Sequence, residues 1–146
     1  MLLGAPFVPI NAAVLKRMVA LLQIQPGEKA ADLGSGDGRV IIELAKAGAK
    51  AQGYEINPLL VLASRRNIRN VAVAKQATIH WKNFWTEDLS SFQVITLFGM
   101  PHMMEKLQEK LTKELKPGAR IISHQFRFPD WPISQQESQL YLYRVS

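Results

Sequence analysis

Apolar residues recur along this chain at two alternating spacings, one typical of helices and one typical of buried strands. Between Ala12 and Leu22 they fall three and four residues apart, as on the buried face of a helix. Ala30 to Leu33 is a short, mostly apolar run that favours a buried strand. The same change of spacing repeats toward the C-terminus. It predicts helices over 12–22, 40–47, 58–69 and 101–115, and strands over 30–33, 50–56, 78–81, 94–99, 119–126 and 138–145.

This alternation of helices and strands predicts the fold class. Strands that are joined through helices run parallel, with the helices packed on both faces of the sheet. We therefore expect a doubly wound, Rossmann-like α/β fold with a mostly parallel sheet. The 146 residues contain no internal repeat or linker. We expect one compact domain over 1–146, with a helical lead-in over 1–28 and a Rossmann-like core over 29–146.

Three glycines follow the first predicted strand, in the stretch DLGSGDGR (32–39). In such a sheet, ligands bind beyond the carboxyl ends of the strands, and glycines let a backbone approach a ligand closely. A dinucleotide-binding loop would need a glycine at the position of Arg39, and no Gly-Lys-Ser/Thr of a phosphate-binding loop is present. The spacing of Gly34, Gly36 and Gly38 instead resembles the first motif of class I S-adenosylmethionine-dependent methyltransferases.

Polar residues at the ends of three predicted strands fit that ligand. Asp32 could receive the cationic ammonium end of S-adenosylmethionine, and Glu55, at the end of the second strand, could accept hydrogen bonds from the ribose hydroxyls. The amide oxygen of Asn83 could accept from the adenine amine, while the backbone N–H of Phe84 reaches a ring nitrogen. Plainer roles stay open, because aspartates such as Asp32 and Asp37 also cap turns and aromatic residues beside strands are often core.

Five segments together carry a closer resemblance: PFVP (6–9), DLGSGDGR (32–39), GYEINPLLV (53–61), FGMPHMM (98–104) and FRFPDW (126–131). In this order and spacing the chain resembles the small seven-β-strand lysine methyltransferases that modify the adenine nucleotide translocase and the ATP synthase c subunit. The resemblance covers about 6–131. It implies transfer of a methyl group from S-adenosylmethionine to a lysine ε-amine of a protein, with cofactor-binding residues Asp32, Gly34, Gly36, Gly38, Glu55, Asn83 and Phe84. Asn83 stands where the family usually has aspartate.

The same chemistry needs a dry channel, because an apolar environment favours the neutral, nucleophilic form of lysine. Apolar residues in the family-like motifs are candidates to line it, with backbone carbonyls near Gly99 orienting the amine; they are Phe7, Phe98, Met100, Pro101 and Trp131. Each could equally be core. No strong general base stands out, although His102 and His124 are candidates by chemistry.

The charge of the chain leaves a second enzyme class open. The net charge is +6, from 18 Lys+Arg against 12 Asp+Glu, which favours acidic partners. The tightest basic group, Arg65, Arg66 and Arg69, fits a solvated helix face better than a nucleic-acid footprint. An RNA methyltransferase is therefore the alternative enzyme, although no N-P-P-Y-type motif follows the fourth strand. A non-catalytic S-adenosylmethionine-binding module is the alternative outside the enzymes.

Other features of the composition indicate the cellular compartment in which we expect the protein. The chain has no cysteine, which fits a reducing compartment, and no apolar run reaches the roughly 20 residues of a membrane span. We expect a cytoplasmic protein, a prokaryotic relative of the family, that is a monomer or weak oligomer. His80, His102 and His124 lack metal-ligand spacing, so no metal site is expected.

Overall fold

The computed structural model describes residues 10–146. Its helices are α1 (Ala12–Leu22), α2 (Arg39–Lys46), α3 (Pro58–Arg69) and α4 (Pro101–Glu114), with short 3-10 turns η1 (Ala74–Gln76) and η2 (Phe84–Thr86). Its strands are β1 (Lys29–Leu33), β2 (Lys50–Glu55), β3 (Ala77–Trp81), β4 (Val94–Phe98), β5 (Arg120–His124), β6 (Gln135–Glu137) and β7 (Leu140–Arg144).

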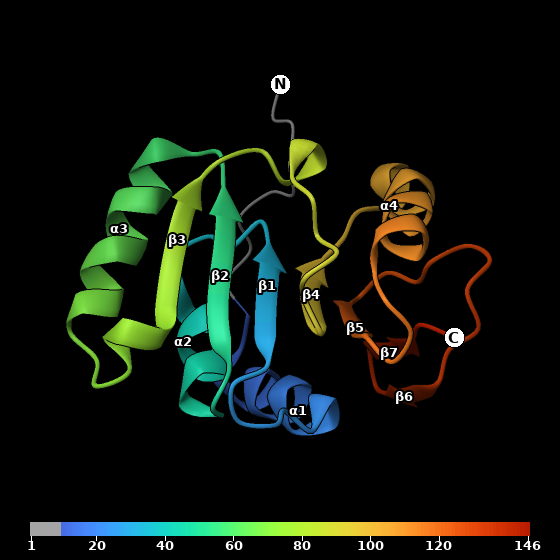
Figure 1. Cartoon of the computed structure of the whole chain (residues 1–146), viewed down its shortest axis with the longest axis horizontal. Coiled ribbons are helices and arrows are strands. Elements are labelled where there is room, and N and C mark those ends of the chain that lie inside the picture. The colour runs from blue at the N-terminus through green and yellow to red at the C-terminus, as the bar shows by residue number, and fades with distance from the viewer. Residues whose placement is uncertain (1–9) are drawn as a thin grey trace.

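All seven strands form one sheet in the order β3-β2-β1-β4-β5-β7-β6 (Figure 1). The first five strands pair in parallel, and β7 is antiparallel to both of its neighbours. The chain runs outward from β1 through β2 to β3, then returns to the other side of β1 to form β4 and β5. The strand order therefore reverses between β1 and β4. This is where open α/β sheets bind ligands, at the carboxyl ends of the strands.

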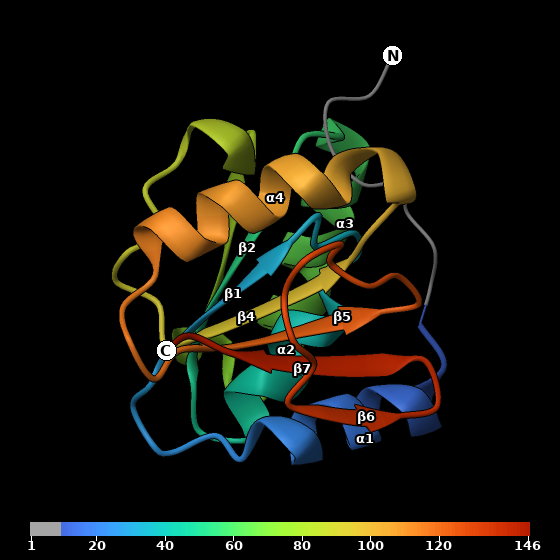
Figure 2. The ribbon, with the colours of Figure 1, turned by 90° about the vertical axis from the view of Figure 1, so that its right-hand side faces the viewer.

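Helices cover both faces of the sheet. Figures 1 and 2 show α1, α2 and α3 on one face and α4 on the other, together with the long segment that joins β5 to β6. Each face has its own hydrophobic cluster. Leu22, Ile41 and Val61 contribute to the first cluster, and Leu97, Leu107 and Tyr143 to the second. Burial on both faces explains why the central strand β4 is apolar at nearly every position.

The predicted α/β fold is confirmed, and the boundaries of the predicted elements all agree within two residues. The fifth strand is shorter than expected, since it ends at His124, and the last strand begins only at Leu140. The strand β6 was not predicted. Its three residues, Gln135, Gln136 and Glu137, are polar and mostly exposed on the edge of the sheet, so no apolar pattern marks them.

A buried arginine ties the end of α1 and the turn before β1 to the sheet. The Arg120 guanidinium, at the start of β5, donates two hydrogen bonds to the Glu28 carboxylate, at 2.6 and 2.9 Å, and a third to the Leu22 carbonyl at 2.9 Å. These contacts join the end of α1 and the turn before β1 to the centre of the fold. Among residues 10–146, no helix has the length and apolar content needed to cross a bilayer.

Candidate active site

The glycine loop connects β1 to α2 at the carboxyl edge of the sheet. Gly34, Gly36 and Gly38 have φ angles of 82°, 58° and 88°, all in the left-handed region that side chains disfavour. The backbone N–H groups of Gly34 and Ser35 both donate to the Tyr54 carbonyl, at 2.9 and 3.0 Å, which ties the loop to the end of β2. The conformation of this turn therefore requires glycine at all three positions.

Two buried side chains hold Gly36 from opposite sides. A Glu55 oxygen, Oε1, accepts the Gly36 N–H at 2.7 Å, and the Ser64 hydroxyl of α3 donates to the Gly36 carbonyl at 2.6 Å. The other Glu55 oxygen accepts the N–H groups of Ile56 and Asn57. Glu55 is therefore a brace of the loop, a role that was not predicted. Its Oε1, which accepts a single hydrogen bond, also has acceptor capacity that a ligand can use.

The loop is also packed too tightly to admit larger residues beside it. A Cβ on Gly53, in the middle of β2, would lie 2.6 Å from the Ser35 Oγ and 2.9 Å from Ile79. A Cβ on Gly38 would lie 3.3 Å from that of Ser64. Gly53 and Ser64 thus position the loop without belonging to its motif. Ser64 had a detectable signal, because it is a polar residue on the apolar stripe of α3 with Val61 and Ile68.

Asp32 lies one residue before the end of β1 and is 5% exposed. Its Oδ1 accepts a hydrogen bond of 2.7 Å from the Thr96 hydroxyl on the neighbouring strand β4. Burial raises the pKa of Asp32 to about 7; the Thr96 hydrogen bond opposes the rise, and the Glu55 charge adds to it. Thr96 is the only polar residue of β4, which is the signal that could have identified it. A cation bound here would favour the ionised carboxylate.

Three of the predicted channel residues lie beside the loop. Gly99, Met100 and Pro101 follow β4, which pairs with β1, and they lead into the first turn of α4. A side chain on Gly99 would collide with the Met104 sulfur. Gly99 therefore packs closely against the Met104 side chain, while Met100 is partly buried against the cluster on that face. Because β4 is the parallel neighbour of β1, these residues lie at the same edge of the sheet as the loop.

The residues after β3 that are predicted to contact adenine also have structural roles of their own. The Asn83 side chain caps η2 by accepting the Trp85 N–H at 3.0 Å. The Phe84 side chain is 2% exposed and packs in the core, with its ring centroid 4.9 Å from that of Trp85. The side chain of Phe84 thus belongs to the hydrophobic core, which is the alternative that the sequence had left open for it. Contact of Asn83 and the Phe84 backbone with a base stays a prediction.

Trp131 is not placed with the other channel candidates. Its indole N–H donates to the Arg144 carbonyl at 3.3 Å, and its ring packs against Phe128 and Tyr143. Arg144 pairs with Arg120, the first residue of β5, so Trp131 lies toward the amino end of that strand. The segment after β5 turns back along the sheet and packs on its α4 face, which explains this position of Trp131. A role of Trp131 in the channel stays a prediction. The predicted channel residue Phe7 lies outside the described residues.

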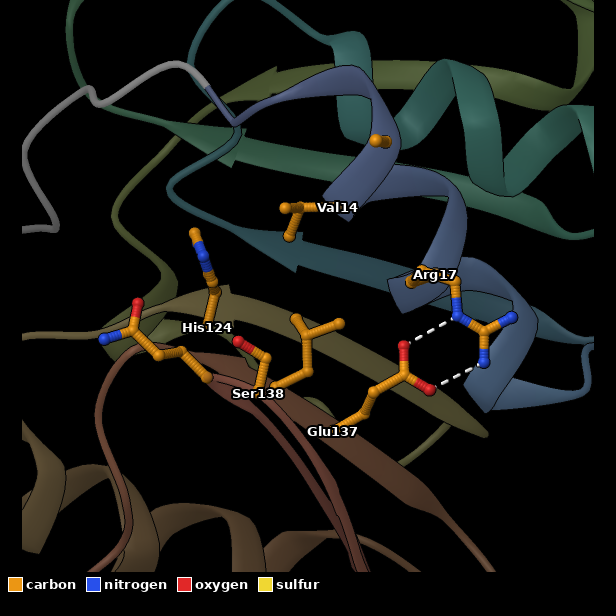
Figure 3. A pocket seen from close by; sticks show the side chains of 8 residues that line it. Val14, Arg17, His124, Glu137 and Ser138 are labelled. Atoms are coloured by element: carbon orange, nitrogen blue, oxygen red, sulfur yellow. Dashed lines mark hydrogen bonds and ion pairs between the residues drawn. The ribbon is translucent and has the colours of Figure 1, made fainter.

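A pocket of about 230 Å³ lies at the carboxyl end of β5, between α1 and the β6–β7 hairpin (Figure 3). Val14 lines it from α1, and Arg17 and Glu137 form a bidentate ion pair at its side. His124 also lines it, with its ring against Phe98 and its Nδ1 buried without a partner in the described part of the chain. Burial lowers the pKa of His124, so the ring is neutral at pH 7. Its use as a general base stays a prediction.

The other histidines lie elsewhere. His80 faces Gln52 across β2 and β3 and stacks on Tyr54, and His102 is exposed in the first turn of α4. Within residues 10–146, no group of three or more His, Cys, Asp or Glu side chains is arranged to hold a metal ion. The ligand-binding potential of the site therefore rests on the glycine loop and its carboxylates.

Solved structures define the class of this fold. The chain matches the crystal structure of an RNA methyltransferase from Salinibacter ruber, in complex with S-adenosyl-L-homocysteine, with a TM-score of 0.87 and 33% identity over 94% of this chain and 92% of that one. The strand order and the position of the glycine loop are those of class I methyltransferases.

Within that class, residues 32–135 match the family profile of the ANTKMT methyltransferase domain, and the chain belongs to this family. It is 40% identical over 126 residues to the rat (Rattus norvegicus) lysine N-methyltransferase of the ATP synthase c subunit; the match spans 86% of this chain and 58% of the relative. It is 39% identical over 128 residues to a protein-lysine N-methyltransferase of Saccharolobus islandicus, covering 86% of this chain and 80% of the relative. The chain thus spans little more than half the length of the mammalian relatives.

Proposed function

We propose that this protein transfers a methyl group from S-adenosylmethionine to the ε-amine of a lysine in a protein substrate. The observation that carries the proposal is the family match, which includes relatives named as protein-lysine N-methyltransferases and an archaeal one of which the chain covers 80%. The motif from Phe98, the last residue of β4, to Met104 supports it, because this segment lies at the same edge of the sheet as the glycine loop.

The residues around the loop fit S-adenosylmethionine. The bare backbone from Gly34 to Gly38 leaves space for the methionine and ribose parts. The Asp32 carboxylate is suited to a cationic ammonium group, and the remaining acceptor capacity of Glu55 is suited to ribose hydroxyls. When bound, the cofactor supplies a methyl group that is activated on a sulfonium.

The chain's own part in the reaction is to position and desolvate the amine. A lysine has an ordinary pKa of about 10.4 and must arrive neutral to act as a nucleophile. Phe98, Met100 and Pro101 provide an apolar border that disfavours the ammonium form, and the Gly99 carbonyl is available to orient the amine by accepting a hydrogen bond. Holding the amine in line with the methyl group is the contribution we assign to this segment.

A labelling experiment tests the substrate class. The full chain is incubated with methyl-labelled S-adenosylmethionine and, in parallel, with total protein or total RNA from one lysate. We expect label in protein that resists nuclease, and methyl-lysine after acid hydrolysis. Glu55→Ala should abolish the labelling. Label that appears only in RNA, or in another amino acid, contradicts the proposal.

An RNA substrate is the second candidate, because the Salinibacter ruber structure that the chain resembles is described as an RNA methyltransferase. The net charge of +6 is compatible with it. The family match favours lysine, and the RNA arm of the labelling experiment separates the two. For location we propose the cytoplasm, which the absence of cysteine supports.

A further inference from the structure

One stretch of the chain concentrates both positive charge and exposed apolar surface. Residues 56–86 contain no Asp or Glu, although the chain has 12 of them, and they contain basic residues at 65, 66, 69, 75 and 82. Among residues 10–146 the large apolar side chains that are strongly exposed are Leu59 at 74%, Leu62 at 62% and Trp81 at 63%. All three fall in this same stretch. A binding partner for this stretch must therefore accept both positive charge and exposed apolar side chains.

These residues come together on one edge of the molecule. Leu59 and Leu62 lie on α3, one turn apart, and the Trp81 indole N–H donates to the Ile56 carbonyl at 3.0 Å, beside the start of that helix. Figure 1 shows α3 and the edge strand β3 side by side at the end of the sheet. We call Leu59, Leu62, Arg65, Arg66, Arg69 and Trp81 the α3 patch.

The arginines of the patch are free to bind a partner, as far as the described part of the protein shows. Arg65, Arg66 and Arg69 are exposed and form no ion pair with any described residue. A groove runs beside them, between α3 and β3. Its arginines are Arg65 and Arg69, and its other lining residues are mostly apolar: Leu62, Ile68, Ala77, Thr78 and Ile79. The groove can therefore hold a group that is both anionic and partly apolar.

We propose that the α3 patch docks the protein on the surface of an anionic lipid bilayer. Projecting Leu and Trp side chains insert at the boundary between headgroups and acyl chains, and arginines bind the headgroup phosphates. The aliphatic side chains are what favour lipid over RNA, since they offer nothing to a sugar-phosphate backbone. The strong exposure of Leu59, Leu62 and Trp81 favours a lipid surface, because lipids can rearrange around projecting side chains. The proposal is independent of the proposed methyl transfer.

The apolar end of the patch lies at the same edge of the sheet as the glycine loop, whereas Arg69 ends α3 at the opposite edge. Trp81 ends β3, and Leu59 follows Glu55 by one short turn, so both lie at the carboxyl edge of the sheet with the loop. Binding is expected to be reversible and sensitive to salt, because much of it is electrostatic.

Flotation of the full chain with vesicles tests the proposal. We expect the protein to float with vesicles in which about a third of the phosphatidylcholine is replaced by phosphatidylglycerol, and to stay behind with phosphatidylcholine alone. The triple variant R65Q/R66Q/R69Q should weaken binding on the order of a hundredfold. The matched variant K16Q/K106Q/K113Q removes the same charge from exposed positions on α1 and α4 and should weaken it only a few-fold.

A second measurement does not depend on the charge variants. Lipids brominated on their acyl chains should quench the tryptophan emission of the wild-type protein, and Trp81→Phe should remove most of the quenching. No flotation at low salt, equal losses in both triple variants, or quenching that survives Trp81→Phe would overturn the proposal. Binding of the wild type to an RNA oligonucleotide or to polyglutamate, with no binding to anionic vesicles, would overturn it in favour of those partners.

Discussion

At the scale of single residues, Gly36 is the most constrained position of the site. Its φ of 58° disfavours side chains, and its N–H and carbonyl are both fixed by buried partners, Glu55 and Ser64. The loop therefore cannot shift to relieve a substitution. This combination of local strain and long-range hydrogen bonds explains why glycine is required here, whereas an ordinary turn tolerates several residue types.

Replacement of Gly36 by alanine should lower both stability and cofactor affinity. We expect the free energy of unfolding to fall by about 1–2 kcal/mol, because alanine resists the left-handed region. The affinity for S-adenosylhomocysteine, measured by calorimetry, should fall tenfold or more. Gly27→Ala is the matched control, since Gly27 also has a positive φ, 84°, and a Cβ placed on it would meet nothing within 4 Å. Equal affinity in the two variants would contradict this view of the loop.

Asp32 makes the protein less stable as the pH rises. Its pKa is about 7 in the folded state against an ordinary value near 4, so between these values the native state binds a proton that the unfolded state has lost. The contribution of Asp32 to the free energy of unfolding should therefore fall as the pH rises from 4 to 7 and change little above it. Asp32→Asn should remove this decline and raise the stability at pH 8 by a few kcal/mol at most.

Thermal unfolding of Asp32→Asn between pH 5 and pH 8 measures this effect. Asp37→Asn is the control of opposite sign, because the neighbouring Arg39 lowers the pKa of Asp37 and its charge is favourable at pH 8. A gain in stability that coincides with a loss of cofactor affinity would identify Asp32 as a group kept for binding. A variant that is less stable than the wild type at pH 8 would refute the assigned pKa.

At the scale of elements, two arginine–glutamate pairs with similar geometry differ in burial. Arg120 and Glu28 join β5 to the turn before β1 and are largely buried, whereas Arg17 and Glu137 join α1 to β6 in solvent. Arg120→Met should lower the free energy of unfolding by about 3 kcal/mol, because it leaves a partly buried carboxylate unpaired. Arg17→Met should change it little. Urea unfolding compares the two, and equal effects would contradict the role given to burial.

Most helices and strands can be predicted from the local spacing of apolar residues. The positions that could not be predicted depend on contacts between residues far apart in the sequence. The spacing of apolar residues predicts α1 and α4 almost residue by residue, since each helix has one continuous buried face. The segment after β5 has no such period. The position of Trp131 depends on Tyr143 and on the Arg144 carbonyl, which belong to a strand formed later in the chain. No local pattern could have placed it.

The candidate site likewise has features that the local sequence predicts and contacts that only the folded chain brings together. The left-handed glycines and the carboxylates at strand ends could be predicted from their positions in the sequence, because turn conformation and strand ends are local properties. The braces of the loop could not be predicted. Ser64 reaches Gly36 from α3, and Ser35 packs against Gly53 of the neighbouring strand β2, so these contacts exist only once the fold has formed.

At the scale of the whole molecule, the reversal of strand order between β1 and β4 gathers the site from separate parts of the chain. Asp32 and the glycine loop come from the first third, Thr96 and Gly99 from β4 and the turn after it, and the braces from β2 and α3. A ligand bound there contacts elements on both sides of the sheet's centre. Its binding should therefore stabilise the fold as a unit and raise the temperature of global unfolding.

S-adenosylhomocysteine should accordingly raise the unfolding temperature of the full chain. At a hundred times its Kd a ligand adds about 2.7 kcal/mol to the free energy of unfolding, which for a chain of 146 residues corresponds to a shift on the order of 10 °C. NAD and ATP are the matched ligands, because the glycine spacing lacks the third glycine of a dinucleotide loop and the Gly-Lys-Ser/Thr of a phosphate loop. They should leave the unfolding temperature unchanged. A shift of the same size with NAD would show that the loop selects nucleosides in general, and the specificity that we infer from its spacing would then be wrong.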